Sequence, residues 1–144
     1  MRPLLILAAL LLVSLAAAIS GAAPQDAHEH SAHEHPADDR GVFRAIAQAP
    51  AEAREWRNPY EGDPNALLAG KKLFLQHCAE CHGENARGLG HAPNLHSPGI
   101  QNATPGELVW FLRNGNLAAG MPSWSRMPVE RRWQIVTYLK SFRH

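Results

Sequence analysis

Cysteine is scarce in this chain, which contains only two among its 144 residues. They are Cys78 and Cys81, and a disulfide between positions so close would constrain almost nothing, so we expect no disulfide staples. A zinc site lacks support, because no second cysteine pair and no His-x-x-x-His pair supplies the remaining ligands. A thioredoxin-like redox pair requires a βαβ context, which the sequence does not show.

Two further features are missing. Lysine and arginine form no runs and the aromatic residues form no ladder, which argues against a nucleic-acid partner. The longest apolar stretch runs from Leu4 to Ile19. It falls short of the about 20 residues that span a bilayer comfortably.

The first 23 residues are predicted to be a secretory signal peptide. Met1 and Arg2 form a short positive region, an apolar stretch follows, and small residues lead into Pro24. Cleavage after Ala22 or Ala23 fits the small-residue rule, and cleavage after Ala18 is also compatible. The length of the apolar stretch favours cleavage over an uncleaved anchor, so we expect a periplasmic or otherwise exported protein, held at a membrane only if the leader remains.

Residues 24–62 are predicted to be an acidic, His-rich flexible arm. His-Glu-His occurs twice between residues 28 and 35, a pattern that binds copper, zinc or nickel in some chains. Nothing nearby builds a rigid surrounding for such a metal, which favours a solvated linker. A short helix is expected over residues 42–48, and Trp56, Pro59 and Tyr60 are the residues best suited to lie against a domain.

The sequence Cys78-Ala79-Glu80-Cys81-His82 carries the strongest chemical signal. Two thiols three positions apart, followed at once by an imidazole, form the pattern of covalent c-type haem attachment. The sequence therefore predicts one covalent haem c. A large apolar ring at the centre would also stabilise a small core that has no disulfides.

The residues around this pattern predict helices. Asp63 and Pro64 suit a helix start, and apolar positions recur at three and four up to Cys78. Gly70 inside this helix indicates the close approach of another helix. Residues 83–103 are expected to form a loop. Thr104 and Glu107 form a capping box that predicts the start of a helix, which ends at residues 114–115. Residues 116–127 are expected to form a second loop. The last helix is expected from near Pro128, so residues 63–144 are predicted to form one all-α domain of three to four helices.

These motifs resemble those of class I, mono-haem c-type cytochromes over residues 63–142. The resemblance rests on residues 78–82 followed by Gly83, on Gly120-Met121-Pro122-Ser123-Trp124, and on helical faces around Gly70 and Tyr138. It implies thioether bonds from Cys78 and Cys81 and proximal iron ligation by His82. It implies further that the carbonyl of Pro93 orients this imidazole and that Met121 is the distal ligand, while Arg87 and Trp124 contact the propionates or the haem edge.

Other residues compete for the distal position. Met127 also precedes a proline, but packing before the last helix accounts for it. His91 and His96, on the loop after the haem motif, would give bis-histidine ligation. Met121 is favoured by ligand chemistry.

The implied function is one-electron transfer between redox partners of a respiratory chain or of a dehydrogenase or oxidase system, without enzymatic activity. Two alternatives are a haem enzyme or gas sensor with a labile sixth ligand, and a metal-binding protein acting through the His-rich arm. Residues 66–144 carry nine basic side chains against four acidic ones, which favours a partner with an acidic docking face. Lys71, Lys72 and Arg126 either steer such a partner or are only solvated surface residues.

Overall fold

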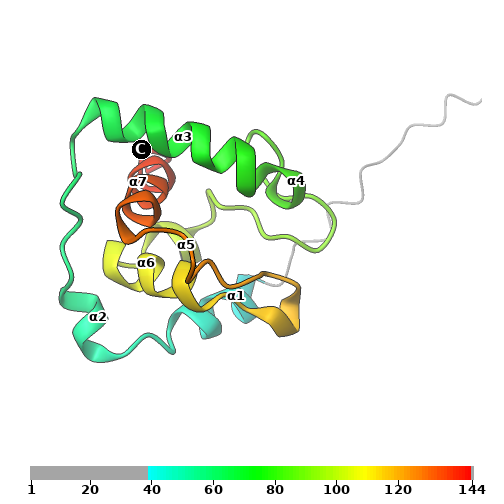
Figure 1. Cartoon of the computed structure of the whole chain (residues 1–144). Coiled ribbons are helices and arrows are strands. Elements are labelled where there is room, and N and C mark those ends of the chain that lie inside the picture. The colour runs from blue at the N-terminus through cyan, green and yellow to red at the C-terminus, as the bar shows by residue number, and fades with distance from the viewer. Residues whose placement is uncertain (1–38, 144) are drawn as a thin grey trace, which may run out of the picture. The chain divides into compact units, whose positions relative to one another are not determined.

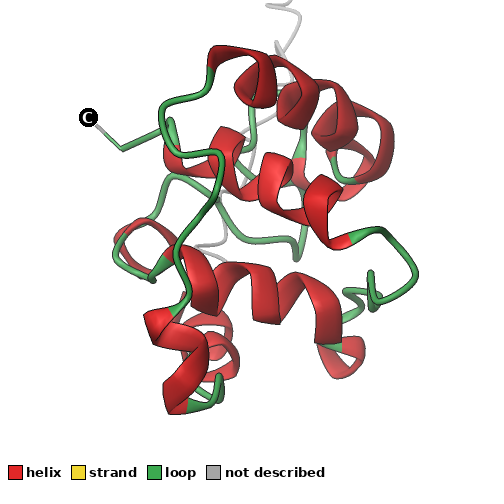
Figure 2. Ribbon diagram, turned by 60° about the vertical axis from the view of Figure 1, so that its left-hand side comes forward, coloured by secondary structure: helices red, strands yellow, loops and turns green. Residues whose placement is uncertain are grey.

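A computed structural model describes residues 39–143 of the chain, so the leader expected at residues 1–23 and the repeated His-Glu-His lie outside the described residues. Within residues 39–143 all regular elements are helical, which confirms the all-α prediction (Figure 2). The elements are α1 (Asp39–Ile46), α2 (Ala51–Glu55), α3 (Pro64–His77), α4 (Ala79–His82), α5 (Pro98–Gln101), α6 (Pro105–Asn114), the 3₁₀ turn η1 (Leu117–Ala119) and α7 (Val129–Lys140).

The crossing of α3 and α7 is the main helix contact of the fold (Figure 1). Gly70 lies at this crossing, where a Cβ atom would collide with the backbone carbonyl of Gln134. The glycine therefore allows the two backbones to approach, as the sequence predicted. One turn further along α3, the Phe74 ring lies 5.4 Å from the Tyr138 ring of α7.

Side-chain hydrogen bonds cap the N-termini of α3 and α6, the two helices whose starts were predicted from capping residues. The Asp63 carboxylate accepts from the backbone N–H groups of Asn65 and Ala66 at the start of α3. At α6, the Thr104 hydroxyl accepts from the Glu107 N–H at 3.1 Å, and the Glu107 carboxylate accepts from the Thr104 N–H at 2.8 Å. These bonds satisfy donors that the helix itself leaves free, so the capping box is confirmed.

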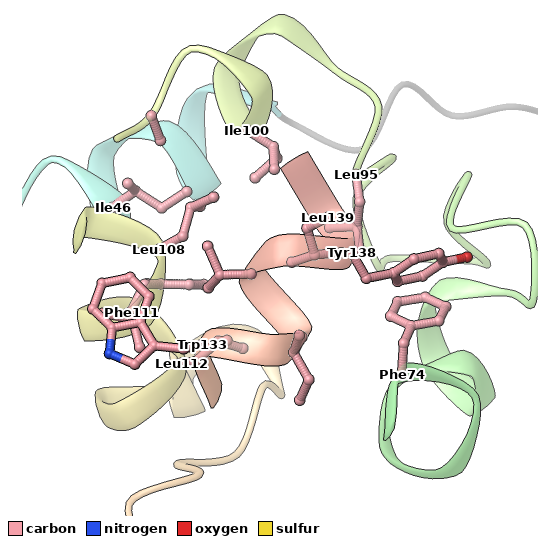
Figure 3. Close-up of a cluster of buried hydrophobic side chains, with 14 of the residues drawn as sticks. Ile46, Phe74, Leu95, Ile100, Leu108, Phe111, Leu112, Trp133, Tyr138 and Leu139 are labelled. Atoms are coloured by element: carbon pink, nitrogen blue, oxygen red, sulfur yellow. The ribbon is translucent and has the colours of Figure 1, made fainter. Parts of the chain in front are cut away.

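The core lies where α3 and α6 meet α7 (Figure 3). Phe74 and Tyr138 face each other at one end of the cluster, and Phe111, Leu112 and Trp133 lie at the other. Phe74 is fully buried. The buried apolar cluster comprises Ile46, Phe74, Ala86, Leu95, Ile100, Ala103, Leu108, Val109, Phe111, Leu112, Trp133, Ile135, Val136, Tyr138 and Leu139.

Several residues between positions 42 and 60 pack onto the other helices, whereas the sequence predicted a flexible arm over residues 24–62. Ile46 of α1 is 2% exposed and Ala53 of α2 is fully buried. The Asn58 amide donates to the Thr137 hydroxyl of α7 at 2.9 Å. Helices of eight and five residues are too short to be stable alone. Tertiary burial therefore stabilises this segment, and such contacts are not visible in its composition.

Two local details also differ from the sequence expectation. The sequence predicted that the helix starting at Pro64 runs into the haem motif. Instead α3 ends at His77, the helix is interrupted at Cys78, and the rest of the motif forms the separate short helix α4. The loop over residues 83–103 contains α5, where Ile100 and Gln101 are buried. The Gln101 amide donates to the carbonyls of Leu95 and Leu139, and these bonds hold the short helix against α7.

Candidate functional site

The two cysteines and His82 lie on one wall of an internal cavity. Cys78 occupies the break between α3 and α4, and the His82 N–H donates to its carbonyl at 2.9 Å. Cys78 is partly buried and Cys81 is exposed, and both thiols are free. Burial, and secondarily the nearby Cys81, raise the pKa of the Cys78 thiol to about 11. This segment thus presents two thiols and an imidazole to the same space.

The His82 ring is held in one orientation by a backbone carbonyl. Its Nδ1 lies 3.2 Å from the carbonyl oxygen of Pro93. Because a carbonyl oxygen only accepts hydrogen bonds, Nδ1 carries the proton of the neutral ring, and Nε2 keeps a free lone pair. Burial lowers the pKa of His82, while the hydrogen bond to Pro93 opposes this shift. The neutral imidazole is the form that binds metals.

The cavity has a volume of about 630 Å³, within the range of sites that enclose small molecules. Helices α1, α3, α4, α5, α6 and α7, the turn η1 and the loops between them form its walls. Its lining is mainly apolar and consists of Val42, Ile46, Phe74, His77, Cys78, Glu80, Cys81, His82, Leu89, His91, Ala92, Pro93, Leu95, Ile100, Leu108, Phe111, Leu112, Asn116, Ala119, Gly120, Met121, Pro122, Trp124, Ile135 and Leu139.

Met121 belongs to a tight loop that is part of the cavity wall. Asn116 and Met121 exchange two backbone hydrogen bonds of 2.9 and 3.0 Å, and the turn between them closes at Gly120 with a φ of +82°. The Trp124 N–H donates to the Leu112 carbonyl of α6 at 3.0 Å. The Ser123 hydroxyl donates to the Arg113 carbonyl at 2.6 Å. These bonds attach the methionine loop to α6.

The competing ligands differ in their positions. His96 is stacked on Phe142 at 4.2 Å, its Nε2 lies 2.9 Å from the Asn85 carbonyl, and it does not line the cavity. Met127 packs against the apolar core, again outside the cavity lining. His91 is exposed and does line the cavity. The structure therefore brings Met121 and His91, but neither His96 nor Met127, into the cavity wall.

Of the two residues expected at the haem edge, Trp124 lines the cavity and Arg87 does not. Trp124 lines the cavity, and its ring lies 5.4 Å from the ring of His77. Arg87 is exposed and does not line the cavity, so the structure gives no support to its expected contact. The sequence alone did not assign His77, Val42 or Ile46 to the wall. Val42 and Ile46 lie four positions apart on the apolar face of α1. This spacing was the available signal, but the surrounding segment is mixed in composition.

The chemistry of the lining fits haem. An apolar interior, two free thiols and a neutral imidazole on one wall, and a thioether on the methionine loop are the groups that a covalently attached haem with two axial ligands requires. Within residues 39–143, no cluster of three or more His, Cys, Asp or Glu side chains is suited to a separate metal ion. No helix in that range is long and apolar enough to cross a membrane.

Comparison with known proteins agrees with this chemistry. Residues 65–139 match the family described as cytochrome C oxidase, cbb3-type, subunit III. Cytochrome c550 of Pseudomonas aeruginosa is 30% identical over 148 residues, covering 98% of this chain and 92% of that protein. The cbb3-type cytochrome c oxidase subunit CcoP of Rubrivivax gelatinosus is 45% identical over 56 residues, covering 36% of this chain. The aligned part is only 18% of the length of that subunit.

A solved structure shares the fold. Cytochrome CL from Methylophaga aminisulfidivorans superposes with a TM-score of 0.51 at 25% identity, covering 58% of this chain and 57% of that one. The family match contains α3, α4, α5 and α6 almost completely and most of α7. The chain therefore belongs to the family of cytochrome C oxidase, cbb3-type, subunit III, and is a c-type cytochrome.

Proposed function

We propose that this protein is an exported cytochrome with a single haem c, which carries one electron at a time between redox proteins and has no enzymatic activity of its own. The observation that carries the proposal is the cavity, whose wall contains both thiols, a neutral His82 and Met121. The only two cysteines of the chain are both in this wall, which supports a single covalent haem.

Each wall residue has a distinct proposed role. Cys78 and Cys81 would hold the group by thioether bonds, and the free Nε2 of His82 would be the proximal ligand. Pro93 fixes the imidazole through its carbonyl, 3.2 Å from Nδ1. Met121 would be the distal ligand. Bound in this way, haem supplies a one-electron iron couple.

The buried part of the remaining lining would limit the access of water to a bound haem. Leu95, Ile100 and Leu139 are each less than 10% exposed, and all three line the cavity. With His82 and Met121 as its two protein ligands, haem would keep no open coordination position, and this together with the apolar surrounding would favour electron transfer over binding of a substrate. Trp124, beside His77, is the proposed contact at the edge of the group.

Export and partner choice rest on charge and sequence pattern. The leader at residues 1–23 has the composition of a cleaved signal peptide, which fits a protein that acts in the periplasm. Lys71, Lys72 and Arg126 are exposed. Together with the basic excess of residues 66–144, they favour a partner with an acidic docking face, and their steering would weaken as salt rises.

The distal ligand is tested by exchanging methionines. Oxidised holoprotein is expected to show the near-infrared sulfur-to-iron charge-transfer band, and Met121→Ala is expected to abolish it. The matched control is Met127→Ala, which removes a methionine that lies outside the cavity. Intact-protein mass spectrometry of all three should show one haem per chain and the mature N-terminus. A band that survives in Met121→Ala, or is lost in Met127→Ala, would contradict the assignment.

Binding of carbon monoxide tests whether a protein ligand occupies the sixth coordination position of the iron. The reduced wild type should not bind it rapidly, whereas Met121→Ala should, because removal of the thioether opens the distal position. Rapid binding by the wild type would instead support a labile sixth ligand and a sensor or enzyme function.

A further inference from the structure

A second depression of about 470 Å³ lies beside α2, α6 and α7 and shares no residue with the haem cavity. On α6 it is lined by Val109 and Arg113, whereas Leu108, Phe111 and Leu112 of the same helix line the cavity. The full lining is Trp56, Arg57, Val109, Arg113, Val129, Arg132 and Trp133. The depression is therefore a separate feature of the fold.

Its charge is entirely positive. Three arginines, Arg57, Arg113 and Arg132, belong to its lining, and no acidic residue does. Guanidinium groups stay charged in proteins. Burial, and secondarily the charge of Arg113, lower the pKa of Arg132. Glu130 opposes this shift, but it is exposed and lies outside the lining.

Arg132 is buried without a carboxylate partner. It is 8% exposed, and its Nη1 donates to the carbonyls of Trp124 and Ser125 at 3.2 and 3.5 Å. Its Nε has no hydrogen-bond partner among the described residues. A buried cation that is only partly hydrogen-bonded lacks compensation for its lost hydration, so a nearby negative charge would stabilise it.

Other features strengthen the positive potential. Val129, which lines the depression, is the first residue of α7, and Pro128 before it offers no side chain to cap that helix. The positive end of a 12-residue helix therefore points toward this region. Two indole rings, Trp56 and Trp133, form apolar walls that reduce screening by water.

We propose that this depression binds an oxyanion of the phosphate class. Several guanidinium donors suit a ligand with three or four acceptor oxygens and up to two negative charges better than they suit a single carboxylate. Since the site shares no residue with the cavity, the proposal is independent of the proposed electron-transfer function.

The test is a titration of the reduced, ¹⁵N-labelled holoprotein with inorganic phosphate at constant ionic strength, with chloride as the balancing anion. Saturable shifts are expected for the Nε–H of Arg132 and the indole N–H of Trp56 and Trp133. Arg113→Gln should weaken binding about tenfold, because it removes a charged donor. The matched control is Arg131→Gln, which removes an exposed arginine of α7 outside the lining.

Several outcomes would overturn the proposal. Shifts that grow linearly without saturation, or equal weakening in both variants, would show only general charge screening. Acetate that saturates the same resonances as tightly as phosphate would show a carboxylate site instead. Arg132 itself is not the residue to replace, because its bonds to Trp124 and Ser125 also support the methionine loop. The side chain of Arg113 is exposed, and only its backbone carbonyl holds Ser123.

Discussion

The two walls of the haem cavity are built differently. On the cysteine wall, both thiols and His82 belong to five consecutive residues, and one distant contact, the Pro93 carbonyl, completes the arrangement. On the methionine wall, Met121 belongs to a loop that hydrogen bonds attach to α6. The first arrangement follows from local sequence spacing, and the second follows from contacts that only the folded chain makes.

This difference teaches which groups tolerate change. Attachment chemistry depends on the identity of a few adjacent side chains, so single replacements there should act in an all-or-none manner. The position of Met121 depends on backbone geometry shared among many residues, so replacements near it should act by degrees. The His77 and Trp124 rings, 5.4 Å apart, join the two walls.

The largest expected effect comes from removing the cysteine wall. Replacement of both Cys78 and Cys81 by Ala should abolish covalent haem, and the unfilled cavity of about 630 Å³ should leave the fold much less stable. Denaturing mass spectrometry and thermal unfolding measure these outcomes. Met121→Ala is the matched change on the other wall and should keep the full haem mass. Haem mass retained in the double variant would refute the attachment site.

The next effect concerns α3, the helix that directly precedes the cysteine wall. Gly70→Ala places a methyl group against the Gln134 carbonyl at the crossing of α3 and α7. We expect a loss of about 3 kcal/mol in unfolding free energy, the upper range for overpacking. Denaturant unfolding measures it. Gln76→Ala, on the exposed surface of the same helix, should change stability by less than about 0.5 kcal/mol. Equal effects of the two would mean that the crossing does not need a glycine.

Two glycines in the methionine loop distinguish the cost of a positive φ from the cost of a steric collision. Gly115 has a φ of +69° and an added Cβ would press on the Pro122 backbone, whereas Gly120 has a φ of +82° with nothing within 4 Å. Gly115→Ala should cost about 2–3 kcal/mol and Gly120→Ala about 1 kcal/mol. Unfolding measurements give both values, and the sulfur-to-iron band should weaken more in Gly115→Ala. The reverse order would show that this loop is not held against Pro122.

The smallest effects concern the start of α6, which contributes to the cavity and to the loop anchor. Thr104→Ala removes the hydroxyl of the capping box and should cost about 1 kcal/mol. Arg54→Ala removes a 3.0 Å ion pair to Glu107 from an arginine that is half exposed, and it should cost less than about 0.5 kcal/mol. Chemical denaturation measures the change in unfolding free energy for both variants. A larger loss for Arg54→Ala would indicate that α2 depends on this ion pair.

The starts of α3 and α6 were predictable because their signals are local. Asp63 with Pro64, and Thr104 with Glu107, satisfy helix donors within three residues, so spacing alone reveals them. The packing of α1 and α2 was not predictable. Val42 and Ile46 give α1 an apolar face, but a face in so short a segment does not show which residues far along the chain bury it, and Ala53 of α2 gives no such signal.

The candidate site divides in the same way. The haem motif, the preference for Met121 and the role of Pro93 were all expected from sequence, and His91 and His96 were left as competitors. The tertiary structure separated them, since His96 is stacked on Phe142 with its Nε2 next to a carbonyl, while His91 lines the cavity. A sequence cannot distinguish histidines on one loop, because their environment is set by residues distant from it.

The sequence by itself determined the chemistry of this protein. The proposed haem attachment depends on two thiols and an imidazole at a set spacing, and the helical class depends on local periodicity and capping, so both predictions follow from nearby residues. Only the tertiary structure decided which side chains enclose that chemistry: α1 as part of the cavity wall, Trp124 beside His77, and three arginines around a separate depression. Burial and electrostatic potential depend on distances between remote residues, and folding sets those distances.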